Sequence, residues 1–420
     1  MGDYIKVAWR NLNRNLLRTF IAVLAIAVVV MIVVFSRGII LSFGDRMNDT
    51  YINNTLGHVR IVSEEYRQRE VLLSLDYPLD GFQGEGLTSM LAEIETRDEV
   101  EYLLPRLKFG ALYGGGEDMV GMMGIGIDTD SEIRHGTISA DLTWGRMPET
   151  GNEIVVGIGL LQELGAEPGG RITIMFSDAF QSLRARTFEV VGVRESGFSA
   201  LDDGIFYLPL ITAQDMLGME DQATEILAFS SDRGRAGMLA GDLRELFNSM
   251  GDLERYSILP WEKADPFIEL FLEMDIIYDV IYAAFVFMGS IVVISTMTMI
   301  IRERRTEIGM MSALGMKSSD VMKIFTLEGA FIGLIGSLTG ALGGGLLNFY
   351  LARDGIHVQA LVDTMEGIDA LVDPVFYPVH SLENVIVSFS FGFIIVTLAC
   401  LYPAWKASRL DPVEALKVDA

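Results

Sequence analysis

Four long stretches without Asp, Glu, Lys or Arg constrain this chain most: residues 19–36, 280–301, 329–352 and 384–405. A bilayer core of about 30 Å needs about 20 apolar residues at helical rise, so each stretch predicts a membrane-spanning helix. A long polar segment separates the first stretch from the second, whereas the last three follow one another closely. We therefore expect an integral membrane α-helical protein with four transmembrane helices and one large domain inserted between helices 1 and 2.

Charge is concentrated in that inserted segment. Residues 44–275 hold 42 Asp and Glu against 18 Lys and Arg, and so carry −24 of the chain's net charge of −25. Phosphate backbones would repel such a surface, which argues against nucleic acid as a partner. Period-two apolar segments alternate there with helical patterns and glycine-rich turns, which predicts a mixed α/β domain.

Basic residues near the helix ends indicate the topology. Lys and Arg cluster before the first span, between the second and third, and after the fourth, so both termini are expected in the cytoplasm and the acidic domain outside. The expected order is a cytoplasmic amphipathic helix over 1–18, transmembrane helices over 19–43, 276–301, 326–352 and 382–405, an extracytoplasmic α/β domain over 44–275, a cytoplasmic coupling segment over 302–325, an extracytoplasmic loop over 353–381 and a cytoplasmic tail over 406–420.

The sequence offers little for catalysis. The one cysteine, Cys400, and four scattered histidines make no metal-ligand spacing, so no metal site is expected. Gly315-Met-Lys-Ser-Ser lacks the glycine spacing of a phosphate-binding loop, and the four charge-free apolar stretches contain no charged residue that would mark an ion relay. We expect no catalytic residues and no cofactor in this chain. A row of small residues in the third span, Gly336, Gly340 and Gly344, predicts close helix packing.

Three segments resemble the FtsX/MacB/LolC-E permease superfamily. Residues 302–325 are similar to its Arg-x-x-Glu-Ile-Gly-x-x-x-Ala-Leu-Gly signature and following helix. Residues 402–416 look like its C-terminal Pro-Ala…Asp-Pro-x-x-Ala-Leu motif. Residues 151–170 and 188–217 look like parts of its extracytoplasmic domain, which implies a mainly β subdomain inserted over about 144–216. The four-span chain without a fused ATPase looks closest to the lipoprotein-releasing permeases.

The resemblance implies a permease subunit of a mechanotransmission-type ABC transporter. A separate cytoplasmic ATPase, in two copies, would bind ATP and Mg²⁺ and dock on the coupling segment, and a second permease, identical or paralogous, would complete the complex. The residues expected to carry ATPase docking are Glu303, Glu307, Ile308, Gly309, Leu314 and Gly315.

Release of lipoproteins from a bacterial inner membrane is the leading function that the resemblance implies. Apolar positions flanking the first two spans are expected to line an acyl-chain cavity: Ile40, Phe43, Phe267 and Phe271. A periplasmic chaperone or adaptor is a further implied partner, although residues 174–188 form only a short linker where the chaperone-recruiting permease has a protruding hook. The alternatives are an FtsX-like regulator of a cell-wall hydrolase and a MacB-like drug or peptide export permease.

Overall fold

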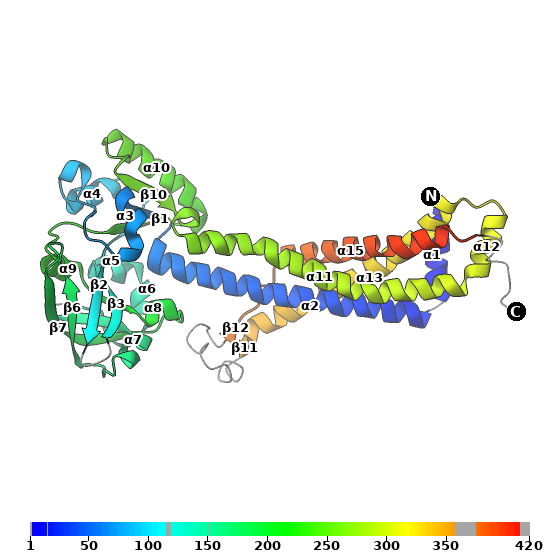
Figure 1. Cartoon of the computed structure of the whole chain (residues 1–420), viewed down its shortest axis with the longest axis horizontal. Helices are drawn as coiled ribbons and strands as arrows, with labels where there is room; N and C mark the ends of the chain where they lie inside the picture. The colour runs from blue at the N-terminus through cyan, green and yellow to red at the C-terminus, as the bar shows by residue number, and fades with distance from the viewer. Residues whose placement is uncertain (1, 15, 115–118, 150, 358–374, 412–420) are drawn as a thin grey trace. The chain divides into compact units, whose positions relative to one another are not determined.

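The apolar stretches of the sequence are helices in the computed structural model, and the acidic segment folds around a β-sheet (Figure 1). The structure describes residues 2–14, 16–114, 119–149, 151–357 and 375–411. The chain divides into two units. Among the described residues, the helix bundle contains 2–44, 273–357 and 375–411, and the α/β domain contains 45–272. The ends of the expected extracytoplasmic loop are described, whereas most of that loop and the last part of the C-terminal motif lie outside the described residues.

In the part of the bundle that the structure describes, the helices are α1 (Gly2–Arg14), α2 (Leu16–Tyr51), α11 (Pro266–Glu303), α12 (Arg305–Ala313), α13 (Ser318–Asp354) and α15 (Leu382–Ser408). Within the described residues, four helical segments are long and apolar enough to cross a membrane: Leu16–Leu56, Ile277–Glu303, Ser318–Asp354 and Leu382–Ser408. They extend beyond the predicted spans because helical hydrogen bonding continues through the polar residues that flank each apolar stretch.

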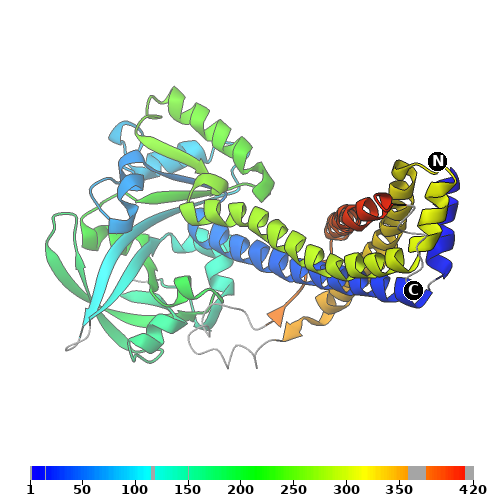
Figure 2. The same ribbon diagram turned by 45° about the vertical axis from the view of Figure 1, so that its right-hand side comes forward.

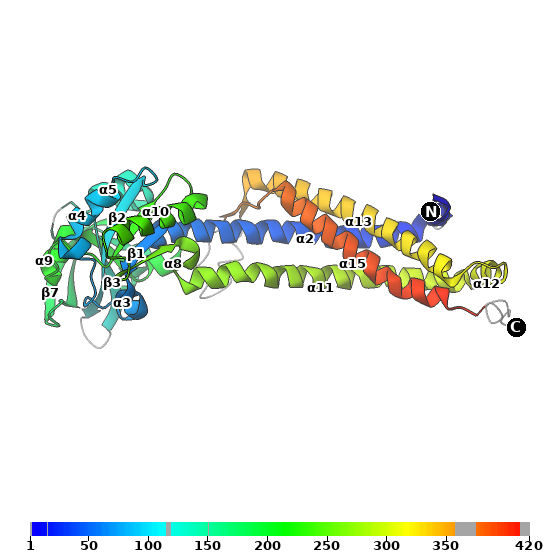
Figure 3. The same ribbon diagram turned by 90° about the horizontal axis from the view of Figure 1, so that it is seen from above.

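Within the bundle, α2 and α11 run antiparallel. Arg37 of α2 forms an ion pair with Asp279 of α11 at 3.4 Å. Closer to the middle of the bundle, a Cβ placed on Gly289 would lie 2.8 Å from Val29, so the two helices approach closely there. Helices α13 and α15 also lie side by side, as Figures 1 and 3 show, and their apolar faces share one core with α2 and α11.

The glycine row of α13 faces α2. Gly336, Gly340 and Gly344 are buried. A Cβ on Gly336 would lie 2.9 Å from Ile26, and one on Gly344 would lie 2.7 Å from Val34. Glycine at these positions permits a backbone approach that any side chain would obstruct.

Ten strands form the sheet of the α/β domain: β1 (Val59–Ser63), β2 (Tyr102–Gly114), β3 (Met119–Ile127), β4 (Leu142–Gly145), β5 (Glu153–Gly157), β6 (Arg171–Ser177), β7 (Leu183–Arg194), β8 (Ile205–Pro209), β9 (Glu225–Phe229) and β10 (Tyr256–Pro260). Their order is β10-β1-β9-β2-β3-β8-β5-β7-β4, and β6 pairs with both β2 and β7. The pairings β2-β3-β8-β5-β7-β6-β2 therefore close a six-stranded ring, whose long strands β2 and β3 are cyan in Figure 2.

Two kinds of packing fill this domain. Amphipathic helices α4 (Leu87–Ile94) and α10 (Ala236–Ser249) bury Met90, Ile94, Leu243 and Phe247 in its main core. Within the ring, the Phe109 side chain makes edge-to-face contacts with Phe176 and Phe206. Such aromatic pairs add about 0.5–1.5 kcal/mol to the effect of burial alone.

Shorter elements join the strands. They are η1 (Ile52–Leu56), α3 (Glu64–Arg69), η2 (Glu70–Leu72), η3 (Phe82–Gly84), α5 (Thr129–His135), α6 (Thr137–Ala140), α7 (Ile158–Glu163), α8 (Ser199–Asp202), α9 (Leu210–Leu217), η4 (Arg233–Arg235) and η5 (Trp261–Lys263). In the helix bundle, the two-residue strands β11 (Ile356–His357) and β12 (Val375–Phe376) pair with each other. Residues 174–188, expected as a short linker, belong to strands β6 and β7 and the tight turn between them.

Candidate functional site

The coupling segment is a short helix between two long ones. Helix α11 ends at Glu303, α12 spans Arg305–Ala313, and α13 begins at Ser318. The intervening turn contains Gly315 at φ +97°, a left-handed conformation that glycine adopts without the steric penalty of a Cβ. The backbone conformation of this turn therefore favours glycine at position 315, where the chain changes direction after α12.

Both predicted acidic docking residues are paired with arginines of the N-terminal helices. Arg14 donates to Glu307 at 2.6 Å, and Arg18 pairs with Glu303. Arg304 links α12 to α1, because its Nε donates to Glu307 of α12 at 3.1 Å and its Nη2 donates to Asn11 of α1 at 2.7 Å. Figure 2 shows α1 in dark blue beside the yellow α12.

These contacts set the charge state of the segment. The hydrogen bond from Arg14 and the positive charge of Arg304 hold the pKa of the Glu307 carboxyl below its ordinary value. Glu307 is therefore ionised at neutral pH and presents an anion to α1. An isolated exposed ion pair of this kind contributes about 0–1 kcal/mol to stability. The Arg14–Glu307 pair therefore stabilises the position of α1 beside α12 only weakly.

The other four predicted docking residues fall into two pairs. Ile308 is 1% exposed and packs in the bundle core, and Gly309 is also buried. Leu314 is 90% exposed, and Gly315 beside it is exposed. An apolar side chain this exposed on a tight turn is the part of the segment that another protein can reach without any rearrangement.

Glu328 is a buried acid that the sequence analysis missed. It lies on α13 one residue before the charge-free stretch that begins at Gly329, and it is 1% exposed. Arg304 and Asn11 lie close to its carboxylate, and its Oε2 has no hydrogen-bond partner among the described residues. The sequence pattern that could have indicated a buried acid is the position of Glu328 between two apolar segments, Ile324–Phe325 and the glycine-rich span.

Of the predicted cavity residues, only Ile40 can be placed in full. It lies on α2, partly buried against the bundle core. Phe43 lies on α2 and Phe267 and Phe271 lie on α11, but their side chains fall outside the described residues.

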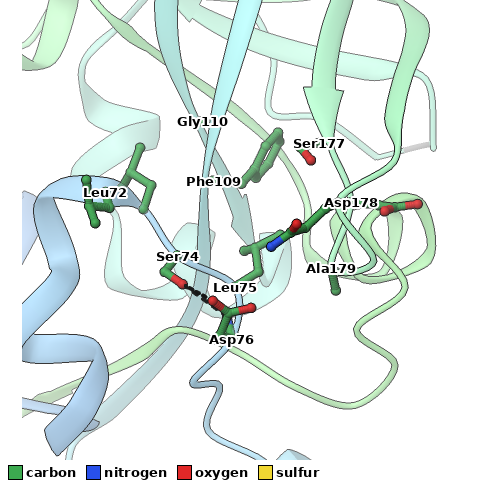
Figure 4. Close-up of a pocket in the computed structure, with 11 residues that line it drawn as sticks. Leu72, Ser74, Leu75, Asp76, Phe109, Gly110, Ser177, Asp178 and Ala179 are labelled. Carbon is green, nitrogen blue, oxygen red and sulfur yellow. Dashed lines mark hydrogen bonds between the residues drawn. The ribbon is translucent and has the colours of Figure 1, made fainter.

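A pocket of about 230 Å³ opens in the α/β domain between η2 and the β6–β7 turn (Figure 4). The Phe109 ring and two carboxylates, Asp76 and Asp178, line it. Ser74 donates to Asp76 at 2.9 Å, while Asp178 accepts from the Ser182 backbone and from Arg184, which lower its pKa. Both acids serve local turns, because Ser74 lies only two residues from Asp76 and Asp178 accepts from backbone N–H groups of the β6–β7 turn.

A buried ion cluster crosses the sheet near this pocket. Glu225 on β9 is fully buried and pairs with Lys108 at 2.8 Å and Arg60 at 2.6 Å, and Arg60 also pairs with Glu70. Although burial opposes it, the charges of Lys108 and Arg60 hold the pKa of Glu225 below its ordinary value. A cluster whose charges balance is structural support rather than a site with a free charge.

Family models match nearly the whole chain. The MacB-like periplasmic core domain matches residues 19–245, more than half of the sequence. The FtsX-like permease C-terminal domain matches residues 280–412, including the coupling segment. The chain belongs to the FtsX- and MacB-type permease superfamily.

Relatives of this permease come from several bacteria. The lipoprotein-releasing system transmembrane protein LolC of Xylella fastidiosa is 26% identical over 277 residues, which are 63% of this chain and 65% of that protein. LolE of Haemophilus influenzae is 23% identical over 338 residues, 77% of this chain and 79% of that protein. The macrolide export ATP-binding/permease protein MacB 2 of Yersinia pestis is 24% identical over 258 residues, 60% of this chain and 34% of that protein. The match thus spans just under two thirds of LolC.

Solved structures of outer domains are also similar to parts of this permease. The periplasmic region of MacB from Actinobacillus actinomycetemcomitans has a TM-score of 0.35 at 15% identity, covering 51% of this chain and 92% of that one. The extracellular domain of the ABC-type transporter YknZ has a TM-score of 0.30 at 14% identity, covering 42% of this chain and 94% of that one.

Proposed function

We propose that this permease couples ATP hydrolysis by a separate cytoplasmic ATPase to the release of lipoproteins from a bacterial inner membrane. The observation that carries the coupling role is the exposed Leu314-Gly315 turn on the short helix between α11 and α13. The substrate is proposed from the LolC and LolE relatives. Both termini would lie in the cytoplasm, with the acidic α/β domain outside.

The coupling residues divide into three roles. Leu314 and Gly315 would contact the ATPase. Ile308 would hold α12 on the bundle core, so that a push on the turn moves the long helices. Glu307 would fasten the segment to α1 through Arg14, and Glu303 would fasten it to α2 through Arg18, in addition to the docking role expected for both acids.

A second permease, identical or paralogous, would complete the transporter, because two ATPase subunits need two docking turns. The acyl chains of the substrate would enter between the bundles, beside Ile40, Phe43, Phe267 and Phe271. Apolar side chains at this level suit acyl chains because they remain in a hydrocarbon environment during transfer. A periplasmic chaperone or adaptor would receive the released molecule.

A MacB-like export function is the second candidate. The MacB-like periplasmic core model matches residues 19–245, more than half of the chain, and MacB 2 is 24% identical where LolC of Xylella fastidiosa is 26% identical. An FtsX-like regulator of a cell-wall hydrolase would use the same coupling turn. The three functions differ in what binds outside the membrane, so partner identification separates them.

Co-purification tests the proposal. The tagged permease is purified from cells in a gentle detergent, and quantitative mass spectrometry identifies what remains bound. Lipoprotein release predicts an ABC ATPase, a permease partner and lipid-modified proteins. Leu314→Asp should remove the ATPase, whereas Ser319→Asp, which adds the same charge at an exposed position nearby, should retain it. A hydrolase or an adaptor in place of lipoproteins would favour an alternative, and retention of the ATPase by Leu314→Asp would refute the docking role.

A further inference from the structure

Asn54 occupies the point where α2 passes into the sheet of the α/β domain. It lies in the π-helical turn η1 (Ile52–Leu56), which follows α2 directly and leads to β1. The residue is only 4% exposed, although it is polar. A buried amide needs hydrogen-bond partners for both of its ends, and those partners define its role.

Two buried arginines hold Asn54. Its backbone carbonyl accepts from Nη1 of Arg106, and its side-chain Oδ1 accepts from Nη2 of Arg194. Its own Nδ2 donates to the Thr50 carbonyl at 2.8 Å, which fixes the amide against the preceding turn. Hydrogen bonds from an ionised donor are about twice as strong as neutral ones.

The two arginines are anchored in different parts of the sheet. Arg106 belongs to β2 and forms an ion pair with Glu132 of α5 at 2.7 Å, where both side chains are 1% exposed. Arg194 belongs to β7, is fully buried, and donates to Asp141 at 2.8 Å and to the Tyr207 hydroxyl at 2.5 Å. Strands β2 and β7 are separated in the ring by β6, so Asn54 connects two positions that are not neighbours.

The entry to the second long helix is tied to the same place. The Tyr51 hydroxyl donates to Asp265 at 2.9 Å, and Asp265 immediately precedes α11. An apolar cluster of Leu56, Ala264 and Ile268 lies alongside. The last turn of α2 and the start of α11 are therefore joined within the α/β domain.

We propose that Asn54 is a positioning residue that transmits movement of α2 to both β2 and β7. Charge-assisted hydrogen bonds in a low-dielectric interior resist deformation, so a displaced Asn54 carries Arg106 and Arg194 with it. This inference rests on the proposed function, because it requires an ATPase that moves α2. The contacts that would transmit the movement are the hydrogen bonds that Asn54 accepts from Arg106 and Arg194.

Three variants separate this role from simple support of the fold. Asn54→Leu keeps a similar volume and removes the side-chain acceptor for Arg194. Asn54→Asp keeps a side-chain acceptor for Arg194, so the coupling between α2 and the two strands should be retained in this variant. Asn53→Ala is the matched control, because Asn53 is half-buried and makes no side-chain hydrogen bond within the described part of the chain. Each variant is purified as the complex with its ATPase in lipid nanodiscs.

Two readouts are compared: the basal ATP hydrolysis rate, and hydrogen exchange of the β2 and β7 amides with and without trapping by ATP and vanadate. We expect trapping to change exchange in the wild type, in Asn54→Asp and in Asn53→Ala. In Asn54→Leu the coupling should weaken by about 5- to 150-fold, the usual range for linked sites, while basal hydrolysis stays within about twofold.

An unchanged trapping response in Asn54→Leu would overturn the inference. An equal loss in Asn54→Leu and Asn54→Asp, together with a lower unfolding temperature in both, would show a structural role and overturn it as well. Absence of any trapping response in the wild type would refute the proposed function itself, and with it the inference.

Discussion

The packing of α13 on α2 can be tested with two adjacent glycines. A Cβ on Gly344 would lie 2.7 Å from the Val34 Cβ and 2.8 Å from the Met31 carbonyl oxygen. A Cβ on Gly343 would lie 3.6 Å from the Met31 sulfur, an ordinary contact distance. Gly344→Ala therefore forces the helices apart, whereas Gly343→Ala does not.

The difference between the two variants isolates the cost of crowding. Both replacements gain the same helix propensity, about 1 kcal/mol for alanine over glycine in a soluble helix, so that contribution cancels. Overpacking of a well-packed core lowers the free energy of unfolding by about 1–3 kcal/mol, and only Gly344→Ala introduces it. Relaxation is restricted here, because the Val34 carbonyl also accepts from Asn348 at 3.0 Å and from Asn384 at 3.2 Å. We expect Gly344→Ala to be less stable than Gly343→Ala by about 1–3 kcal/mol.

The assay is unfolding by SDS in mixed detergent micelles, followed by tryptophan fluorescence, with both variants and the wild type in parallel. Gly343→Ala should be as stable as the wild type or more stable. Equal stability of the two variants, or a less stable Gly343→Ala, would refute the close approach of α13 to α2.

Three further predictions concern charge. Glu225→Gln leaves the buried Lys108 without its carboxylate partner, and Arg60 keeps only Glu70, so the α/β domain should lose about 3–5 kcal/mol of stability. The exposed Glu254→Gln should change nothing, and thermal unfolding measures both variants. Burial and a neighbouring arginine lower the pKa of His135 from 6.5 to about 4. As the pH is lowered from 6.5 to 4, the unfolded chain binds a proton at His135 before the folded chain does, so the stability of the α/β domain should decrease, and it should decrease less in His135→Gln. Identical stability-versus-pH profiles of the wild type and His135→Gln would contradict this. Arg14→Glu and Glu307→Arg should each increase proteolysis of α1, and the double variant should restore protection.

Local patterns were sufficient to predict the main elements. Charge-free length predicted the four apolar helices, because a helix in hydrocarbon must satisfy its backbone internally. Glycine spacing of four in α13 predicted a close-packed face, and these residues do lie against α2. Alternating patterns indicated strands in the acidic segment, such as β1.

Contacts between distant segments could not be predicted. The six-stranded ring depends on β6 pairing with β2, about 60 residues earlier, and no local pattern records that partner. Arg14 and Arg18 match Glu303 and Glu307 in their spacing of four, but the sequence indicated only topology for the first pair and docking for the second. No local pattern indicated either that the sheet buries Arg106 and Arg194, the two arginines around Asn54.

ATP-dependent lipoprotein release from proteoliposomes tests the central claim most directly. The complex of this permease with its ATPase is reconstituted with a fluorescent, lipid-modified lipoprotein, and the fluorescence that leaves the membrane is measured with ATP and with a non-hydrolysable analogue. We expect release only with ATP and only when Leu314 is intact. ATP hydrolysis by the wild-type complex without release of lipoprotein would contradict it.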